Sequence, residues 1–234
     1  MSIVITKRDY ELLRFFNDFK FGKITTLSEL LFVDKLDKFN LARRRLKKLF
    51  DNDLVQRCRC FESGQYVYWL SLEGINYLKS KGIKTYKLLN KLSWGTWEHD
   101  DFIQTVMIEF KKNGIERFLS ERQLLNNSKL DFNIVPDLGV SISDDYMVAV
   151  EVEKNRKTKR RIRRKLEKLN SAKIFKIVLY ITFDRNIADN VESSYACLSD
   201  PSFHLITADR NILLNNSEKI ISSIIKLSEG DSKI

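Results

Sequence analysis

Three carboxylates stand at spacings that suit the binding of a divalent metal ion. Asp137 follows Pro136, and Glu151 and Glu153 come fourteen and sixteen residues later, within a Val-Glu-Val-Glu run. Because side chains alternate along a strand, Glu151 and Glu153 are expected to point the same way, about 7 Å apart. Mg²⁺ commonly binds one or two carboxylates together with waters and phosphate oxygens. The pattern predicts a site for Mg²⁺ or Mn²⁺ that polarises a phosphate and stabilises a leaving oxygen.

A block of positive charge follows these acids directly. Residues 154–168 hold ten Lys or Arg residues and one acid, so this segment carries a net +9, against +10 for the whole chain. Such a segment repels itself and calls for a counter-charge, which the phosphates of nucleic acid supply. The alternative is a solvated, charged helix. The residues of this segment expected to contact DNA are Arg156, Lys157, Lys159, Arg160, Arg161, Arg163, Arg164 and Lys165.

The elements that must position these residues fall into two halves. In the first half, Thr6 and Asp9 form a capping-box pattern at the start of a helix. Gly22 is expected to end that helix, Thr26 to begin a second one, and a third to span residues 38–52.

A hairpin is expected next in the first half. Two short runs rich in Val, Tyr and Trp, 53–61 and 65–70, flank the turn sequence 62–64, and a further helix begins after Ser71. Three helices and a hairpin make a winged helix-turn-helix domain, assigned to residues 1–82.

The third helix of this domain is strongly basic. In a winged helix such a helix can enter the major groove, where cations meet phosphates and guanine edges. Solvated surface charge and a protein-docking role are the alternatives. The cations expected to contact DNA from this helix are Arg43, Arg44, Arg45, Lys47 and Lys48.

The second half has an α/β pattern, assigned to residues 96–228, between a connector at 83–95 and a polar tail at 229–234. Helices and strands alternate, which indicates a mixed sheet covered by helices. The expected helices span 97–112 (capped by Thr96), 156–172, 186–196 and 217–227, and the expected strands span 115–120, 133–141, 146–153, 173–183 and 203–207.

The order of motifs in the second half resembles the PD-(D/E)xK nuclease-like superfamily from about Trp94 to Thr207. Asp137 matches the motif's Asp and Glu151 its Asp/Glu, while Glu153 stands where most members have Lys. Lys154 is adjacent, but on a regular strand it faces away from Glu151 unless a bulge intervenes. The alternative is a lysine such as Lys165 that reaches in from the next helix.

The first helix of the second half offers two further candidates. Glu98 lies one turn before Phe102, and His99 one turn before Ile103, so both line up with the expected inward face. The superfamily resemblance implies that an acid on this helix assists the metal site, which makes Glu98 a ligand candidate beside His99. The alternatives are a favourable charge in the first helical turn and a capping histidine.

Nearly the whole chain is similar to the plasmid replication-relaxation family, in size and order to its MobC-type mobilization relaxases. The resemblance implies a winged helix-turn-helix followed by a restriction-endonuclease-like domain, which nicks one DNA strand at a plasmid transfer origin with a divalent metal. It also implies an accessory mobilization protein and a coupling protein as partners in conjugation. The segments that carry it are 42–49, 53–55, 68–70, 97–100, 136–137 and 150–153.

Two questions about the chemistry stay open in the sequence. A covalent relaxase mechanism needs a nucleophile such as Tyr146, Tyr180 or Tyr195, whereas hydrolysis by a metal-activated water needs none. The alternative functions are a non-catalytic DNA-binding regulator of replication or transcription with a nuclease-like fold, and a less specific endonuclease.

Cysteine usage and hydropathy bear on the compartment. Cys58, Cys60 and Cys197 are an odd number with a one-residue gap, which is typical of a reducing environment rather than a disulfide framework. The chain has neither an apolar run of 18 residues nor a signal-peptide pattern, and the apolar side of the basic segment is too thin for membrane insertion. We therefore expect a cytoplasmic protein.

Overall fold

The computed structural model describes residues 4–32, 36–60, 64–87, 89, 94–127, 135–144 and 146–231. The chain is a mixed α/β protein that divides into two compact units, Met1–Ile108 and Glu109–Ile234. The division falls inside one long helix, α5 (Trp94–Lys112). Among the helices of the described residues, none combines the length and apolar character needed to cross a bilayer.

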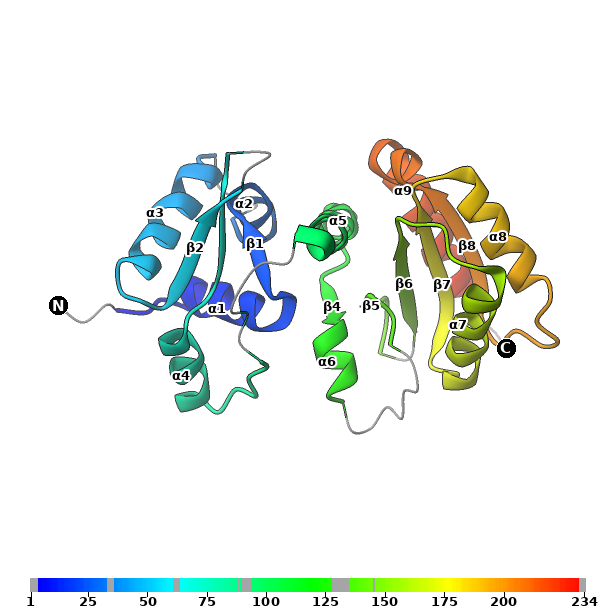
Figure 1. Ribbon diagram of the computed structural model, residues 1–234, viewed down its shortest axis with the longest axis horizontal. Coiled ribbons are helices and arrows are strands. Elements are labelled where there is room, and N and C mark those ends of the chain that lie inside the picture. The colour runs from blue at the N-terminus through cyan, green and yellow to red at the C-terminus, as the bar shows by residue number, and fades with distance from the viewer. Residues whose placement is uncertain are drawn as a thin grey trace. The chain divides into compact units, whose positions relative to one another are not determined.

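The first unit consists of helices around a small antiparallel sheet (Figure 1). Strand β3 lies in the middle of the sheet and pairs with β1 on one side and β2 on the other. In chain order, the elements of the first unit are α1 (Lys7–Phe19), β1 (Phe21–Lys23), α2 (Ile24–Leu31), α3 (Lys38–Phe50), β2 (Val55–Arg59), β3 (Tyr66–Leu70), α4 (Leu72–Ser80) and α5 as far as Ile108.

The capping box at the start of α1 is confirmed, since Thr6 accepts from the Asp9 backbone and Asp9 accepts from the Thr6 backbone. The prediction that Gly22 ends this helix is wrong. Lys20, with φ of 71°, ends α1, and Gly22 lies within β1, a strand that the sequence pattern did not indicate. The close approach of Leu27 explains the glycine, because an added Cβ would lie 2.8 Å from a Leu27 methyl.

The second helix begins earlier than expected, at Ile24, so Thr26 is a buried residue inside α2 rather than its start. The third helix ends at Phe50 instead of residue 52. The expected hairpin is confirmed as β2 and β3, and Gly64 with φ of 64° follows the part of the turn, residues 61–63, that lies outside the described residues.

The second unit is built on a five-stranded mixed sheet with the order β4-β5-β6-β7-β8. The pairs β4–β5 and β5–β6 are antiparallel, whereas β6–β7 and β7–β8 are parallel and are connected through helices. The elements are β4 (Arg117–Ser120), α6 (Glu121–Leu125), β5 (Leu138–Ser141), β6 (Met147–Glu153), α7 (Lys159–Ala172), β7 (Phe175–Thr182), α8 (Arg185–Tyr195), β8 (His204–Asp209) and α9 (Arg210–Asp231).

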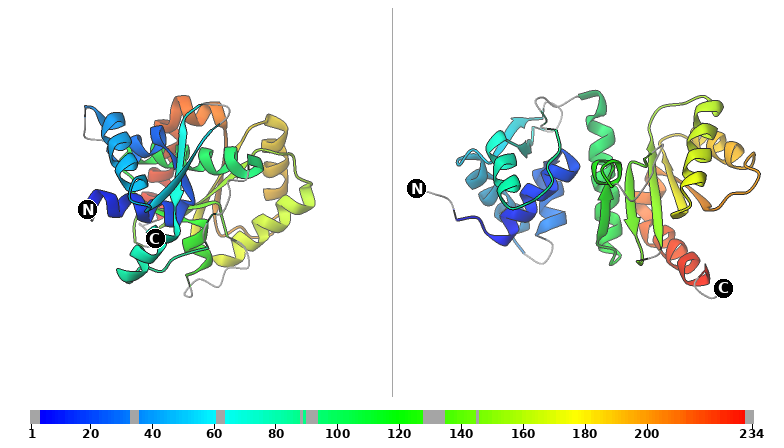
Figure 2. Two further views of the ribbon diagram at one scale, coloured as in Figure 1. Left: turned by 60° about the vertical axis from the view of Figure 1, so that its left-hand side comes forward. Right: turned by 90° about the horizontal axis from the view of Figure 1, so that it is seen from below.

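Helices α7 and α8 cover one face of this sheet (Figure 2). Ile162, Leu166 and Leu169 of α7 pack on that face, as the narrow apolar side of the basic segment predicts. The face includes Ala149 of β6 and Tyr180 of β7. Because side chains alternate, the next two residues of β6 on this face are Glu151 and Glu153. The sheet thus directs both acids towards the basic helix.

Several boundaries in the second half differ from the prediction. Helix α5 begins at Trp94, so Thr96 lies inside it and does not cap it. Helix α6 was not expected, although Ser120 and Gln123 form a capping box. Helix α9 extends to Asp231 through a non-helical residue, Asn216, so the expected tail from residue 229 begins as helix. Residues 133 and 134, expected as strand, lie outside the described part.

Candidate active site and nucleic-acid interface

Glu151 and Glu153 lie at the carboxyl end of β6 and are almost completely buried. Glu151 is 1% exposed and Glu153 is 4% exposed. Two acids on one face of a strand can also be an ordinary solvated surface pair, and this burial excludes that interpretation. Burying two carboxylates in this way is costly unless cations or hydrogen bonds compensate them.

Two lysines of the basic segment supply that compensation. The Lys165 ammonium on α7 bonds Glu151 Oε2, and the Lys157 ammonium, just before α7, pairs with Glu153 Oε2. The prediction that Lys165 reaches in from the helix is confirmed in its geometry. Lys154, the other candidate, follows the end of β6 and its side chain is exposed.

Lys157 and Lys165 were also predicted to face nucleic acid. In the structure both ammonium groups turn towards the buried acids, and their contact with nucleic acid stays a prediction. The sequence indicates the inward position of Lys165, because this residue follows Ile162 at helical spacing and borders the apolar side of α7.

Asp137 joins the same cluster from the start of β5. Its Oδ2 accepts a hydrogen bond of 2.8 Å from the backbone N–H of Val152, which lies between the two glutamates. The antiparallel register of Leu138 with Val150 fixes this position. The structure thus brings together Asp137 and Glu151, as the spacing of the sequence motifs predicts, and adds Lys165, one of the two lysines that the sequence left as alternatives.

The charges of this cluster act strongly on one another. Complete burial, reinforced by Asp137 and opposed by Lys165, raises the pKa of Glu151 to about 8. Burial disfavours the charged form of Lys165, but Glu151 and Asp137 outweigh it and raise the pKa of this ammonium. The charged form of Lys165 is therefore favoured while Glu151 is ionised, and Glu151 itself can take up a proton near neutral pH.

Two buried oxygens at this end of the sheet have no hydrogen-bond partner among the described residues: Glu151 Oε1 and Thr182 Oγ1. Thr182 lies on β7 opposite Glu153 in the parallel register. Buried polar atoms without a partner are rare and call for a water, ion or ligand. Sequence reasoning missed Thr182, because a Thr at a strand end is common and carries no motif.

The fit of a metal ion rests on two carboxylates. Among the described residues, no group of three His, Cys, Asp or Glu side chains could hold a metal. Asp137 and Glu151 remain as a pair, and Glu151 has an unpartnered oxygen, whereas Glu153 is paired with Lys157. Two carboxylates suit Mg²⁺ or Mn²⁺ when waters and phosphate oxygens complete the shell. The predicted third ligand, Glu153, is instead neutralised by its lysine.

Glu98 and His99 lie on the first turns of α5, in the first unit. Glu98 is exposed, and His99 Nδ1 lies 3.3 Å from Asp100 Oδ1. Asp100 in turn pairs with Lys20 at 3.1 Å. The described contacts of this turn are made within the first unit, and the part of Glu98 and His99 in the acidic cluster stays a prediction.

The tyrosines are poorly suited to nucleophilic attack. Tyr180 lies opposite Glu151 in the sheet, and burial together with Glu151 and Glu153 raises the pKa of its hydroxyl. Tyr195 donates to the Phe203 carbonyl at 2.7 Å, and Tyr146 is 6% exposed. Phenolate formation at Tyr180 is thus disfavoured.

The outer face of α7 keeps most of its predicted cations in solvent. Arg163 also pairs with Glu167 at 2.9 Å. A helix that carries its counter-ions inside and an arginine surface outside suits the backbone of nucleic acid. The exposed cations of this segment are Arg156, Lys159, Arg160, Arg161, Arg163 and Arg164.

Helix α3 likewise exposes Arg43, Arg44, Lys47 and Lys48, as predicted. Arg45 differs from the prediction of an outward-facing cation, because it turns inward. Its Nε donates to Asp9 Oδ1 at 2.8 Å, and this carboxylate has no exposed surface. Its packing against α1 makes Arg45 part of the fold rather than of a free basic face.

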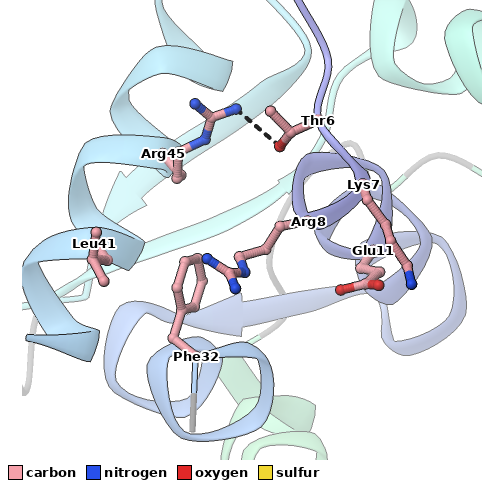
Figure 3. A pocket seen from close by; sticks show the side chains of 7 residues that line it. All are labelled: Thr6, Lys7, Arg8, Glu11, Phe32, Leu41 and Arg45. Atoms are coloured by element: carbon pink, nitrogen blue, oxygen red, sulfur yellow. Dashed lines mark hydrogen bonds between the residues drawn. The ribbon is translucent and has the colours of Figure 1, made fainter. Parts of the chain in front are cut away.

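A pocket of about 500 Å³ opens beside Arg45 (Figure 3). Arg45 also donates to Thr6 Oγ1 at 3.2 Å, and the Arg8 guanidinium lies 5.0 Å from the centre of the Phe32 ring. Lys7 and Glu11 carry opposite charges on its rim. The lining thus carries three cations and one acid, and one of the cations, Arg45, is already bonded to the buried Asp9.

Comparison of the chain with family models, with curated proteins and with solved structures gives no match.

Proposed function

We propose that the protein is a metal-dependent DNA strand-nicking enzyme. The observation that carries the proposal is the buried cluster of Asp137, Glu151 and Lys165, which lies directly beneath the basic helix α7. A carboxylate pair with a neighbouring lysine is a set of groups that can hold a divalent cation and a phosphodiester. The arginines on the outer face of α7 suit a DNA backbone that runs beside this cluster.

Each side chain of the cluster has a distinct task in this proposal. Asp137 and Glu151, through its unpartnered Oε1, would hold a divalent metal, and that metal would supply a Lewis acid for the phosphate. Lys165 holds Glu151 Oε2, and thereby orients the other oxygen, and keeps a positive charge beside the reacting phosphate. Lys157 neutralises Glu153, so that a second buried acid does not repel the anionic substrate.

The architecture supports a finer assignment of both units. In the first, α2, α3 and the β2–β3 hairpin have the order of a winged helix-turn-helix, with the exposed cations of α3 available to the major groove. In the second, the mixed sheet with acids at the end of β6 has the order of a restriction-endonuclease-like domain. A plasmid mobilization relaxase, acting with an accessory protein and a coupling protein, combines these two parts and is the role we propose.

A non-catalytic DNA-binding regulator is the second candidate. The ion pair of Glu153 with Lys157 favours it, because that acid occupies the motif position of a catalytic lysine and is itself neutralised. In this case the acids and lysines of the cluster are structural, and the basic surfaces of α3 and α7 carry the whole function.

A nicking assay separates the two candidates. Supercoiled plasmids with and without the cognate transfer origin are incubated with Mg²⁺ or Mn²⁺ and with wild-type, Asp137→Ala or Lys165→Met protein. We expect relaxed circles from the origin plasmid, and a loss of at least about 100-fold in both variants. Asp144→Ala is the control, since Asp144 is an exposed acid that pairs with exposed Arg117.

The outcomes contradict the proposal in different ways. Binding without nicking by the wild type, with both metals, supports the regulator. Equal nicking of both plasmids supports a less specific endonuclease. Undiminished nicking by Asp137→Ala would remove the acidic cluster from the reaction.

A further inference from the structure

Arg57 of the first unit is held in place by three aromatic side chains. The Arg57 guanidinium on β2 lies 4.1 Å from the centre of the Phe50 ring and 4.5 Å from that of Tyr66. Phe50 is the last residue of α3 and Tyr66 the first of β3. The guanidinium therefore lies over two aromatic rings that belong to different elements.

A third contact fixes its orientation. Tyr68, opposite Arg57 in the hairpin register, has a buried side chain that receives a hydrogen bond from Arg57. Burial raises the pKa of the Tyr68 hydroxyl, and Arg57 and Arg43 partly oppose that effect. Arg43 of α3 thus lies within electrostatic reach of the same hydroxyl, so the arginine at the base of the hairpin adjoins the basic face of α3.

The hairpin register shows why this face differs from the opposite one. Arg57 and Tyr68 are one pair and Arg59 and Tyr66 the next, so their side chains share the face next to α3. The opposite face carries Val67 and Trp69, which pack in a hydrophobic cluster. Tyr66 is 41% exposed, and Arg57 is half-buried, so the stacked arginine reaches the surface.

We infer that Arg57 is a positioning residue for nucleic acid, binding a backbone phosphate of duplex DNA that lies along α3. A guanidinium whose rotamers are already fixed loses little entropy on binding, and its planar donors match phosphate oxygens in a bidentate way. The inference rests on the DNA-binding part of the proposed function. It adds the base of the hairpin, between α3 and β3, to the interface.

The test is fluorescence anisotropy with a labelled duplex of mixed sequence, about two helical turns long, in EDTA, so that cleavage plays no part. Arg57→Lys keeps the charge but loses the planar fork; we expect about tenfold weaker binding with an unchanged salt slope. Arg57→Met removes the charge as well and lowers the salt slope by about one. Arg59→Lys, the same substitution two residues further on β2, is the matched control and changes affinity by less than about twofold.

A second pair of variants tests the stacking itself. Tyr66→Phe keeps the ring over Arg57 and is expected to bind like the wild type. Tyr66→Leu removes the ring but leaves the arginine and its charge, and is expected to bind about threefold more weakly. Melting temperatures of all variants, measured without DNA, report any purely structural role.

Each of the following results would overturn the inference. If Arg57→Lys lowers the melting temperature while the folded protein binds the duplex as the wild type does, the role of Arg57 is purely structural. It then only stabilises the packing of α3 against the hairpin. If the unlabelled single strand competes better than the duplex, the surface binds unpaired bases instead. Absence of any binding by the wild type would overturn the DNA-binding proposal as well, whereas normal binding by Arg57→Lys would overturn this inference alone.

Discussion

Asp9 and Glu151 are both carboxylates buried beneath a basic helix, yet their surroundings differ. Asp9 accepts four hydrogen bonds, two from Arg45 and two from Thr6, and both of its oxygens are occupied. Glu151 is bonded by Lys165 through Oε2, while Oε1 has no partner among the described residues. The first cluster is complete in itself, whereas the second leaves an acceptor unused.

The pKa values of the two acids shift in opposite directions for this reason. Burial alone would raise the pKa of Asp9, but the hydrogen bonds from Arg45 and Thr6 outweigh it and lower the pKa. For Glu151 burial dominates and raises the pKa to about 8. A fully satisfied buried acid is a structural element, while one that is buried and partly unsatisfied is a candidate for chemistry.

The largest expected effect comes from removing the satisfied acid. Asp9→Ala breaks the capping box and leaves Arg45 without its carboxylate, which we expect to cost about 3 kcal/mol of unfolding free energy. Urea denaturation measures this. Asp51→Ala, which removes an exposed partner of Lys47 at the end of α3, is the control and should cost no more than about 0.5 kcal/mol. An equal loss of unfolding free energy in the two variants would show that the buried pair of Asp9 stabilises the fold no more than the exposed pair of Asp51.

The next effect concerns the outer surfaces of the two basic helices. Neutralising Arg161 and Arg164 on α7 to Gln should weaken binding to duplex DNA about 10- to 30-fold at roughly physiological salt and lower the salt slope by about two. The double variant with Arg44→Gln and Lys48→Gln is the matched comparison, because it removes two exposed cations from α3 as the first variant does from α7. Melting temperatures should stay within about 2 °C of wild type, because all four side chains are exposed. An unchanged slope for the α7 variant would mean that this helix does not face DNA.

The smallest effect is a pH dependence of stability with opposite signs for the two acids. Because the folded-state pKa of Glu151 is raised from 4.5 to about 8, its contribution to stability is present below pH 4.5 and is lost as pH rises towards 8. Glu151→Gln should therefore gain about 1 kcal/mol or more relative to wild type as pH rises from 5 to 8.

Asp9→Asn is the counterpart for the depressed pKa. Its deficit relative to wild type should be constant above about pH 5 and shrink as pH falls below 3.8. Denaturant midpoints across the pH range measure both variants. Parallel pH profiles for wild type and Glu151→Gln would show that Lys165 compensates Glu151 fully.

The periodicity of the sequence predicts most elements, and the reasons for the misses are local. The sequence pattern does not indicate strand β1, because this strand has only three residues. Gly22 resembles a helix stop in the sequence, whereas in the structure it allows close packing against Leu27. Residues before Leu138 were expected as strand, but β5 begins one residue after Asp137. Short elements carry too few residues for a period to be recognised.

The candidate site was predictable in its acids but not in its pairing. Strand alternation places Glu151 and Glu153 on one face, and the motif order brings Asp137 beside them. Which lysine compensates each acid depends on where α7 begins, and its start at Lys159 rather than Arg156 leaves Lys157 in the preceding loop. The same uncertainty applied to Arg45, since the inward position on α3 was decided by Asp9 of another helix.

The short connection between β6 and α7 has a consequence for the order of folding. Lys157 is four residues from Glu153, Lys165 is fourteen from Glu151, and Asp137 is fifteen from Val152. Arg45 and Asp9 are 36 residues apart. Because closing a short loop costs less entropy than closing a long one, we expect the β5–β6–α7 segment to assemble its charged centre early, before β8 and α9 join. During synthesis, Lys157 and Lys165 would then already be paired with their glutamates when β8 and α9 emerge from the ribosome.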